Sequence, residues 1–273
     1  MSISTEIQNR KGARRTSEVP TEVVDLLNKG RIETVNLCEW LIVDQSLLIK
    51  NVFPHIGLDR YITPLVSELG KESNLTAVKA TRIVGNKLFE LCANDNALAS
   101  TYESLLSYPS AEIIRCYAAY IPSLDTQLSL DEKLHRLLPV VADRHYGVRE
   151  IAWMAIRPEI STHLDKSIPV LTEWTSHKDE NIRRFTTEVT RPRGVWCKHI
   201  GRLKENPEQA ISILENLKAD PTKYVQDSVG NWLNDASKSK PDFVSALCNE
   251  WATASDSPHT ARIIKKALRT IRK

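Results

Sequence analysis

The chain has 273 residues, of which 41% are hydrophobic and 26% charged, and its formal net charge is only +3. This composition is typical of a soluble globular protein, and the absence of any run of eighteen apolar residues excludes a membrane-spanning helix. Residues 1–15 lack the apolar core of a secretory signal, which excludes export by that route and predicts a cytoplasmic protein.

Residues 1–18 are polar and basic, and we expect them to form a flexible N-terminal arm. Residues 19–273 contain no low-complexity block or linker, so we predict a single domain. Apolar residues recur there at helical intervals and no segment alternates as a strand does, which predicts helices throughout. The predicted helical segments are 23–49, 58–69, 74–91, 98–107, 110–121, 131–141, 148–155, 163–176, 180–189, 195–206, 207–219, 224–237, 241–254 and 259–272.

One basic or polar residue, here called the anchor residue, recurs near the start of successive helices. The intervals between anchor residues are 36, 34, 34, 43 and 36 residues. This period without strands is typical of stacked helical hairpins, so we predict an all-α superhelix, a HEAT- or armadillo-like solenoid of roughly six or seven repeats. In such a stack the anchor residues line one concave face, where we expect the protein to act. They are Lys79, Arg115, Arg149, Arg183, Gln226 and Arg262.

Positive charge is concentrated in two segments. Residues 176–204 contain eight Lys or Arg against three acids, and residues 261–273 contain six bases and no acid. Such an excess is expected where a protein contacts phosphate, although a solvated helix face has the same composition. We predict a basic concave face that binds DNA. The candidates for phosphate contact are Arg149, Arg183, Arg184, Arg191, Arg193, Lys198 and Lys238.

Acidic residues and tryptophans occur inside these basic segments, where a protein that only binds phosphate gains nothing from them. Glu150 and Trp153 stand three positions apart and share a helix face. Asp235 ends a polar stripe on its helix, and its structural alternative is hydrogen bonding between repeats. For Glu188 the structural alternative is a salt bridge to a nearby arginine. We expect core packing for Trp40, Trp174 and Trp251.

Three segments carry a resemblance to a known family. They are VREIAW at 148–153, IRRFTTEVTRPRGVW at 182–196 and YVQDSVGNWLND at 224–235. They resemble the bacterial DNA alkylation repair proteins of the AlkC/AlkD superfamily, the AlkC branch most closely, over about residues 105–245. The resemblance implies a superhelix of HEAT-like repeats whose basic face cradles duplex DNA. It also implies a bacterial glycosylase that excises bases made cationic by alkylation and is associated with the nucleoid while acting.

The resemblance places the catalytic group at Glu188, Trp196 and Asp235, with Glu150 as a further carboxylate. The implied substrates, 3-methyladenine and in the AlkC branch 3-methylcytosine, carry a positive charge that weakens the glycosidic bond. Negative charge beside the sugar would stabilise an oxocarbenium-like transition state, and an indole face would add cation–π attraction. The expected partner is double-stranded DNA containing alkylated bases. We expect a monomer with no obligate protein partner, no metal and no organic cofactor.

Two other functions stay open. A non-catalytic HEAT-repeat module that binds DNA or protein would keep the basic face and tolerate loss of the carboxylates. A scaffold for proteins alone would present apolar rather than arginine-rich positions. Nucleotide-dependent enzymes and serine hydrolases are excluded because the chain lacks a Gly-rich phosphate loop and a GxSxG elbow. The five cysteines are dispersed without a CxxC pair, and no HxxxH or HExxH occurs, which predicts reduced thiols and no zinc site.

Overall fold

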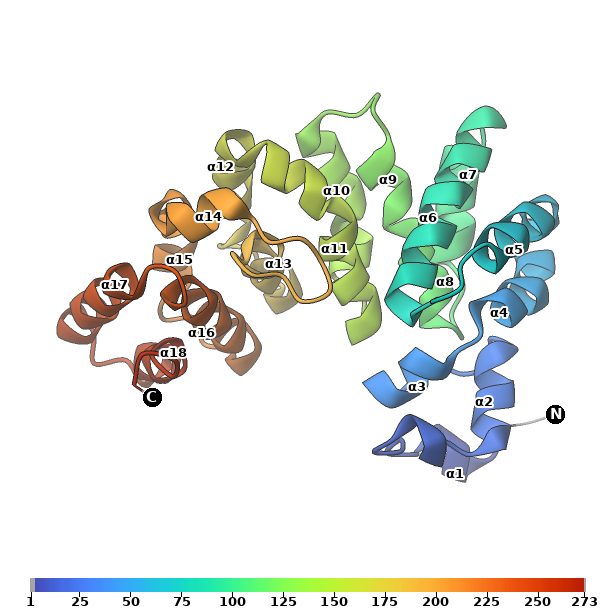
Figure 1. Cartoon of the computed structure of the whole chain (residues 1–273), viewed down its shortest axis with the longest axis horizontal. Coiled ribbons are helices and arrows are strands. Elements are labelled where there is room, and N and C mark those ends of the chain that lie inside the picture. Colours follow the sequence, from blue (N-terminus) through green and yellow to red (C-terminus); the bar gives the residue numbers. More distant parts are fainter. Residues whose placement is uncertain (1–2, 273) are drawn as a thin grey trace. The chain divides into compact units, whose positions relative to one another are not determined.

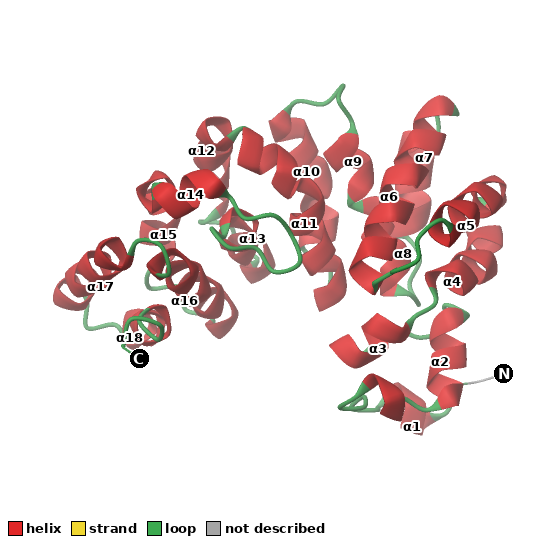
Figure 2. Ribbon diagram, viewed as in Figure 1, coloured by secondary structure: helices red, strands yellow, loops and turns green. Residues whose placement is uncertain are grey.

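The computed structural model describes residues 3–272, and within this range it contains helices and no strand. The predicted all-helical class is therefore confirmed. The chain forms two compact units. Unit 1 holds residues 3–128 and 143–155, and unit 2 holds residues 129–142 and 156–272. Figure 1 labels the helices in chain order, and Figure 2 separates them from the loops.

Unit 1 is built from helices that pack on their neighbours in sequence. These are α1 (Thr5–Gln8), α2 (Thr21–Asn28), α3 (Leu37–Ile42), α4 (Gln45–Val52), α5 (Ile62–Gly70), α6 (Ala77–Asn94), α7 (Leu98–Leu106), α8 (Glu112–Ala118) and α9 (Tyr120–Leu124), with 3-10 turns at Thr16–Glu18, Phe53–Ile56 and Asp59–Tyr61. Helix α6 contacts α5, α8 and α9. Its Leu88 is fully buried together with Leu65 on α5 and Ile114 on α8, so α6 lies at the core of the unit.

Unit 2 is centred on a long helix near the end of the chain. Its helices are α10 (Leu130–Val141), α12 (Leu164–Trp174), α13 (Glu180–Thr190), α14 (Gly201–Glu205), α15 (Ile211–Leu217), α16 (Lys223–Ser237), α17 (Pro241–Ala254) and α18 (Pro258–Ala267), with a 3-10 turn at Pro207–Ala210. Helix α11 (Tyr146–Thr162) begins in unit 1 and ends in unit 2. Helix α16 packs against α13, α17 and α18, and its Trp232 and Val229 are fully buried.

The repeat is visible in where the anchor residues lie. Each of the six falls within the first five residues of a helix, namely α6, α8, α11, α13, α16 and α18. The starts of the helices follow from local sequence. Asp179 accepts a hydrogen bond from the backbone of Asn181 and begins α13, and Ser129 forms a capping box with Glu132 at the start of α10.

Helices α16 and α18 approach each other closely at a glycine. A Cβ atom added at Gly230 would lie 2.8 Å from Cβ of Lys266. Beside this contact, the carboxylate of Asp227 lies 2.6 Å from Lys266 and 2.8 Å from Arg262. Because glycine has no side chain, α16 and α18 lie close enough at position 230 for these ion pairs to form between them.

Some predicted segments are divided in the structure, as residues 23–49 are among α2, α3 and α4, and one predicted helix is wrong. Residues 191–200 form a loop, and α14 occupies only the second half of the helix predicted over 195–206. Trp196 in this loop has a φ of 59°, a left-handed conformation that cannot continue a right-handed helix. The longer-than-expected loop brings exposed side chains next to the end of α13.

The N-terminal segment, predicted as a flexible arm, makes specific contacts within unit 1. Arg10 donates to both carboxylate oxygens of Glu39 at 2.9 and 2.7 Å and to the carbonyl oxygen of Glu33 at 2.7 Å. Glu39 is almost completely buried, so the pairing avoids an uncompensated charge in the core. These contacts differ from the expected free arm because a buried acid of α3 recruits the arginine.

The described residues also bear on other function classes. Within residues 3–272, no helix combines the length and apolar character needed to cross a membrane. In the same range, His, Cys, Asp and Glu side chains do not gather in groups of three that could hold a metal ion.

Candidate functional site

Glu188 and Asp235, two of the predicted catalytic residues, come from neighbouring helices of unit 2. Glu188 lies near the end of α13, Asp235 lies near the end of α16, and the two helices pack together. Trp232 Nε1 donates to the carbonyl oxygen of Thr190 at 3.0 Å, which joins the ends of these helices. Packing of adjacent repeats thus brings the two carboxylates into one region.

The carboxylate of Glu188 is buried and held on both sides. Its Oε1 accepts a hydrogen bond from Ser228 Oγ at 2.8 Å and lies 3.3 Å from the guanidinium of Arg184. Its Oε2 accepts from Arg191 at 3.3 Å. Ser228 Oγ lies 2.6 Å from Thr187 Oγ1, so a pair of buried hydroxyl groups lies beside Glu188. The carboxylate is therefore fixed between α13 and α16.

The carboxylate of Asp235 is also buried, and two cations bind it. Its Oδ2 accepts hydrogen bonds from Arg191 Nε at 2.9 Å and from Nη2 at 2.6 Å. Its Oδ1 accepts from Lys238 Nζ at 3.0 Å. Because Arg191 follows α13, this pair links two repeats, and the structural alternative considered for Asp235 is present in the molecule.

Arg191 lies between the two carboxylates. Its side chain is 13% exposed and contacts both Glu188 and Asp235. Burial lowers the pKa of Arg191, but the attraction of Glu188 and Asp235 outweighs burial and raises this pKa above its ordinary value. The guanidinium therefore stays charged and offsets the repulsion between two neighbouring buried anions.

Three predicted phosphate contacts lie at the outer edge of this cluster. Arg193 donates to the carbonyl oxygen of Asp235 at 3.3 Å and to Ser239 Oγ at 2.7 Å. The side chain of Lys238 is 41% exposed, and Lys198 is exposed on the loop. Side chains of this kind can turn toward a phosphate group without unpacking the core.

Trp196 is the tryptophan that core packing does not explain. The predicted core residues Trp40, Trp174 and Trp251 are buried, which confirms that prediction. Trp196 is 55% exposed, and its neighbour Val195 is 46% exposed. Both lie on the loop between α13 and α14, which runs free of helix in Figure 1 and Figure 2. An indole held in solvent by a left-handed backbone conformation is suited to stack on a ligand.

The contacts of Arg183 favour a structural role over the predicted phosphate contact. Its guanidinium donates to the two carboxylate oxygens of Asp220 at 2.6 and 3.2 Å. The side chain of Asp220 is buried, at 3% exposed, and that of Arg183 is partly buried, at 12%. Arg184, the next residue, lies with its guanidinium 4.3 Å from the ring centre of Tyr224, a cation–π contact.

Three anchor residues make the same backbone contact. Each donates to the carbonyl oxygen of the residue six positions earlier, at 2.7 Å for Arg149, 2.9 Å for Arg183 and 2.7 Å for Gln226. The amide of glutamine donates as a guanidinium does, which explains why a neutral residue is tolerated at the fifth anchor position. The repeated residue therefore closes the turn before its helix, whatever else it contacts.

Glu150, the further predicted carboxylate, belongs to unit 1. Trp153 Nε1 donates to Glu150 Oε2 at 3.0 Å, so the two residues share one face of α11 as predicted. Trp153 itself is buried. This contact satisfies the buried indole N–H and gives Glu150 a structural function within its helix.

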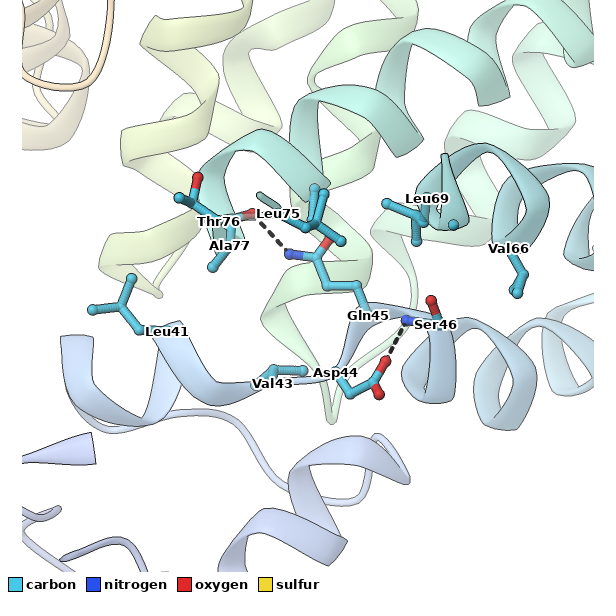
Figure 3. Close-up of a pocket in the computed structure, with 12 residues that line it drawn as sticks. Leu41, Val43, Asp44, Gln45, Ser46, Val66, Leu69, Leu75, Thr76 and Ala77 are labelled. Atoms are coloured by element: carbon cyan, nitrogen blue, oxygen red, sulfur yellow. Dashed lines mark hydrogen bonds between the residues drawn. The ribbon is translucent and has the colours of Figure 1, made fainter. Parts of the chain in front are cut away.

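A cavity of about 440 Å³ lies elsewhere in unit 1, between α3, α4, α5 and α6 (Figure 3). Its polar groups are used within the fold: Gln45 Nε2 donates to the carbonyl oxygen of Ala77 at 2.9 Å, and Asp44 caps α4 through Ser46. Its lining within residues 3–272 includes no cation and none of the predicted site residues. The cavity is therefore not where the predicted chemistry lies.

Sequence reasoning missed three residues of the cluster in unit 2. Ser228 binds Glu188, and Ser239 binds Arg193, but an isolated serine in a helical pattern carries no signal of its own. Arg157 donates to the carbonyl oxygens of Val189 and Arg191. A signal for Arg157 was present, because its Arg-Pro pair repeats the Arg-Pro pair at 191–192.

The cluster combines buried anions with a basic surface. Three cations contact the two carboxylates, and further basic side chains border them on the loop. Such a surface attracts a polyanion, while the anions behind it can stabilise a positive charge that develops close to them. A groove lined only by basic residues could not stabilise such a positive charge.

The chain matches a family model described as DNA alkylation repair enzyme over residues 79–269. A curated relative, the uncharacterized protein YhaZ of Bacillus subtilis (strain 168), is 41% identical over 119 residues. That alignment covers 44% of this chain and 33% of YhaZ, so the chain spans about a third of that relative's length.

Solved structures with the same fold include two helical-repeat proteins. One is Pseudomonas fluorescens alkylpurine DNA glycosylase AlkC bound to DNA containing an abasic site analog, with a TM-score of 0.66 and 22% identity, covering 96% of this chain and 66% of AlkC. The other is AlkD2 from Streptococcus mutans, with a TM-score of 0.60 and 24% identity, covering 77% of this chain and 97% of AlkD2. These similarities confirm the predicted helical-repeat fold.

Proposed function

The chain belongs to the DNA alkylation repair enzyme family, and we propose that it is a DNA glycosylase that excises positively charged N-alkylated bases from duplex DNA. The proposed substrates are bases of the 3-methyladenine type, with 3-methylcytosine as a second. One observation carries the proposal: Arg191 joins the buried carboxylates of Glu188 and Asp235 beside the exposed Trp196. The similarity in fold to AlkC, an alkylpurine DNA glycosylase, agrees with this assignment.

In this mechanism the carboxylates act on the sugar rather than on the base. The C1′–N bond breaks and its electron pair leaves with the base, which departs neutral because it carried a positive charge. Positive charge develops on the sugar, and nearby anions lower the energy of that state. Water then adds to C1′ and releases a proton. Glu188 and Asp235 share the two tasks of stabilising the sugar cation and orienting this water.

Binding of DNA would also change the charge at Asp235. Lys238 is the more exposed of the two cations that hold this carboxylate. A phosphate group near the site competes with Asp235 for Lys238, and departure of the ammonium leaves Asp235 with one cation instead of two. The negative charge available to the sugar therefore increases when the backbone is bound.

Trp196 and the basic residues around it provide the binding surface. The indole is exposed and can stack on the sugar or the cationic base, which favours charged lesions over normal bases. Arg193, Lys198 and Lys238 are the proposed phosphate contacts, with Arg184 and Arg191 behind them. The contacts of Arg149 and Arg183 with backbone carbonyl groups support a structural role within the repeat for these two residues.

A second function is favoured by a specific observation, the burial and ion pairing of both carboxylates. Acids with these contacts would also occur in a non-catalytic module that binds DNA through its basic surface. The two functions differ in whether a base is released.

The test is single-turnover excision from a duplex oligonucleotide that contains one cationic alkylated base, followed by cleavage of abasic sites. Wild-type protein should produce cleavable sites, and the Glu188→Gln, Asp235→Asn double variant should produce almost none per folded molecule, with the folded fraction measured by thermal unfolding. Asp165→Asn is the matched control, since it removes an 80%-exposed carboxylate of the same unit. Tight binding by wild-type protein without excision of any cationic lesion would favour the non-catalytic module.

A further inference from the structure

Arg157 is a buried arginine whose guanidinium lies among backbone carbonyl groups. Only 3% of it is exposed, and it lies in the part of α11 that belongs to unit 2. Its Nη1 donates to the carbonyl oxygen of Val189 at 2.7 Å, and its Nη2 donates to that of Arg191 at 2.5 Å. Its Nε donates to the carbonyl oxygen of Lys198 at 3.2 Å. The acceptors are the end of α13 and both ends of the loop 191–200.

These three acceptors have few other donors available to them. The last carbonyl groups of a helix lack partners within the helix, and those of Val189 and Arg191 lie at the end of α13. A planar guanidinium donates in several fixed directions at once, which an ammonium group cannot do. Arg157 therefore fixes how far apart the two ends of the loop lie.

Gly194 shows independently that the loop folds tightly over this side chain. A Cβ atom added at Gly194 would lie 3.1 Å from Nη2 of Arg157 and 2.1 Å from Sγ of Cys197. A larger residue at position 194 would therefore clash with Cys197 within the loop and crowd the guanidinium, so that the loop would have to change its conformation. Trp196, with its left-handed backbone, lies two residues further along.

We propose that Arg157 is the positioning residue of the site: by holding both ends of the loop 191–200, it sets Arg191 against the two carboxylates and turns Trp196 outward. The backbone of Arg191 is bound by Arg157 while its side chain binds Glu188 and Asp235. The kinetic part of this inference rests on the proposed glycosylase function. The conformational part concerns the loop alone and is tested separately.

The conformational test is fluorine NMR of the full chain labelled with 5-fluorotryptophan. The chain has six tryptophans and should give six resonances, and the one that disappears in Trp196→Phe belongs to Trp196. In Arg157→Lys the Trp196 resonance should shift or broaden more than any of the other five. Arg202→Lys is the matched control, because Arg202 follows the same loop but pairs with Asp165 at 2.8 Å on the surface. It should leave all six resonances unchanged.

The kinetic test is single-turnover excision by the same variants. Arg157→Lys should excise about 10- to 100-fold more slowly, since misplacement by about 1 Å has effects of that size. Binding to DNA should be affected less than excision, because Lys238 lies outside the loop and the long side chains of Arg193 and Lys198 can still turn toward phosphate. An unchanged Trp196 resonance and rate, or an equal shift of all six resonances, would overturn the proposal.

A second variant keeps the test valid if Arg157→Lys does not fold. Gly194→Ala would disturb the same loop through Cys197 and the guanidinium of Arg157, and should also change the Trp196 resonance selectively. A folded Gly194→Ala with a wild-type Trp196 resonance would count against a loop held by Arg157. If the resonance moves as expected in a protein that excises no base, the positioning contact stands and the glycosylase proposal is the one that fails.

Discussion

Two arginine–aspartate pairs in unit 2 have the same chemistry and different surroundings. Arg183 donates twice to Asp220, and Arg191 donates twice to Asp235, with a shortest distance of 2.6 Å in each pair. Each pair joins one repeat to the next. Asp220 is otherwise bound by the backbone and hydroxyl of Thr222, at 2.9 and 2.7 Å, so its carboxylate is enclosed by its own turn.

The second pair, here called the open pair, has further charged partners that the first, the closed pair, lacks, although the two pairs are about equally exposed. Arg191 also binds a second acid, Glu188, and the other oxygen of Asp235 is bound by the partly exposed Lys238. Trp196 lies exposed on the adjoining loop. An ion pair without a second acid or a movable cation is suited to support the fold, whereas one that has both can respond to a ligand. Substitutions at the two pairs should therefore have different effects.

The largest effect is expected at the open pair. Asp235→Asn keeps the size of the side chain and removes its charge, so single-turnover excision should fall by about 10²–10³ on electrostatic grounds. Glu188→Gln should behave similarly. Damaged DNA should still bind within a few-fold, because removing an anion cannot weaken attraction to phosphate. Loss of activity only in proportion to loss of folded protein, measured by thermal unfolding, would make Asp235 a structural residue.

At the closed pair the expected effect is on stability. Asp220→Asn leaves Arg183 buried without its anion and should lower the free energy of unfolding by about 3 kcal/mol. Urea denaturation measures this change. The folded fraction should excise bases at the wild-type rate, and a slower rate per folded molecule would mean that the closed pair also serves the chemistry.

The same pair predicts a dependence on pH. Burial raises the pKa of Asp220, but the hydrogen bonds from Arg183 and Thr222 outweigh it and leave the pKa below its ordinary value. A pKa lowered by folding stabilises the folded state above the unfolded pKa of about 4, and this contribution is lost as pH falls further. Wild-type protein should therefore lose more stability than Asp220→Asn between pH 5 and pH 3 (a range of about two units around that value). Parallel unfolding curves for the two proteins would contradict this.

A smaller effect is expected at the exposed tryptophan. Trp196→Ala should slow excision of cationic lesions about tenfold, the size of a cation–π contact of 1–2 kcal/mol. Its unfolding temperature should stay within experimental error of wild type because the side chain is 55% exposed. Excision of a neutral lesion is the informative control, since a loss of the same size there would point to general damage to the loop.

The smallest effect concerns the salt dependence of DNA binding. Single replacement of Arg193, Lys198 or Lys238 by Ala should lower the slope of log affinity against log salt by about 0.9, one phosphate contact each. Arg183→Ala should leave the slope unchanged because its guanidinium faces Asp220. A lower slope for Arg183→Ala would support the phosphate contact that the sequence predicted for this residue.

Local signals predicted most of the helical fold. The predicted bounds of α17, residues 241–254, are those of the structure, because Pro241 is favoured at the first position of a helix. Helix α13 was predicted one residue short. The anchor spacing also placed the start of each repeat, and at three of the six helices the anchor side chain closes the turn before the helix.

Partners distant in sequence could not be predicted. Arg183 and Asp220 lie 37 positions apart, and Arg157 reaches the loop from 34 positions away. A sequence shows that these residues are charged but not which group each one faces, so structural and surface arginines looked alike. The helix wrongly predicted at 195–206 has the same origin, because the loop is shaped by a distant guanidinium rather than by its own residues.

The close contact at Gly230 has a consequence for how unit 2 opens. A methyl group at this position would meet Cβ of Lys266, an atom too near the backbone to move aside, and would push α18 away from α16. Lys266 and Arg262 would then lie too far from Asp227 to form their ion pairs with it. Backbone amides of α18 should therefore exchange with solvent deuterium faster in Gly230→Ala, while those of α13 keep their protection. One missing side chain thus sets how readily the last helix detaches from the one before it.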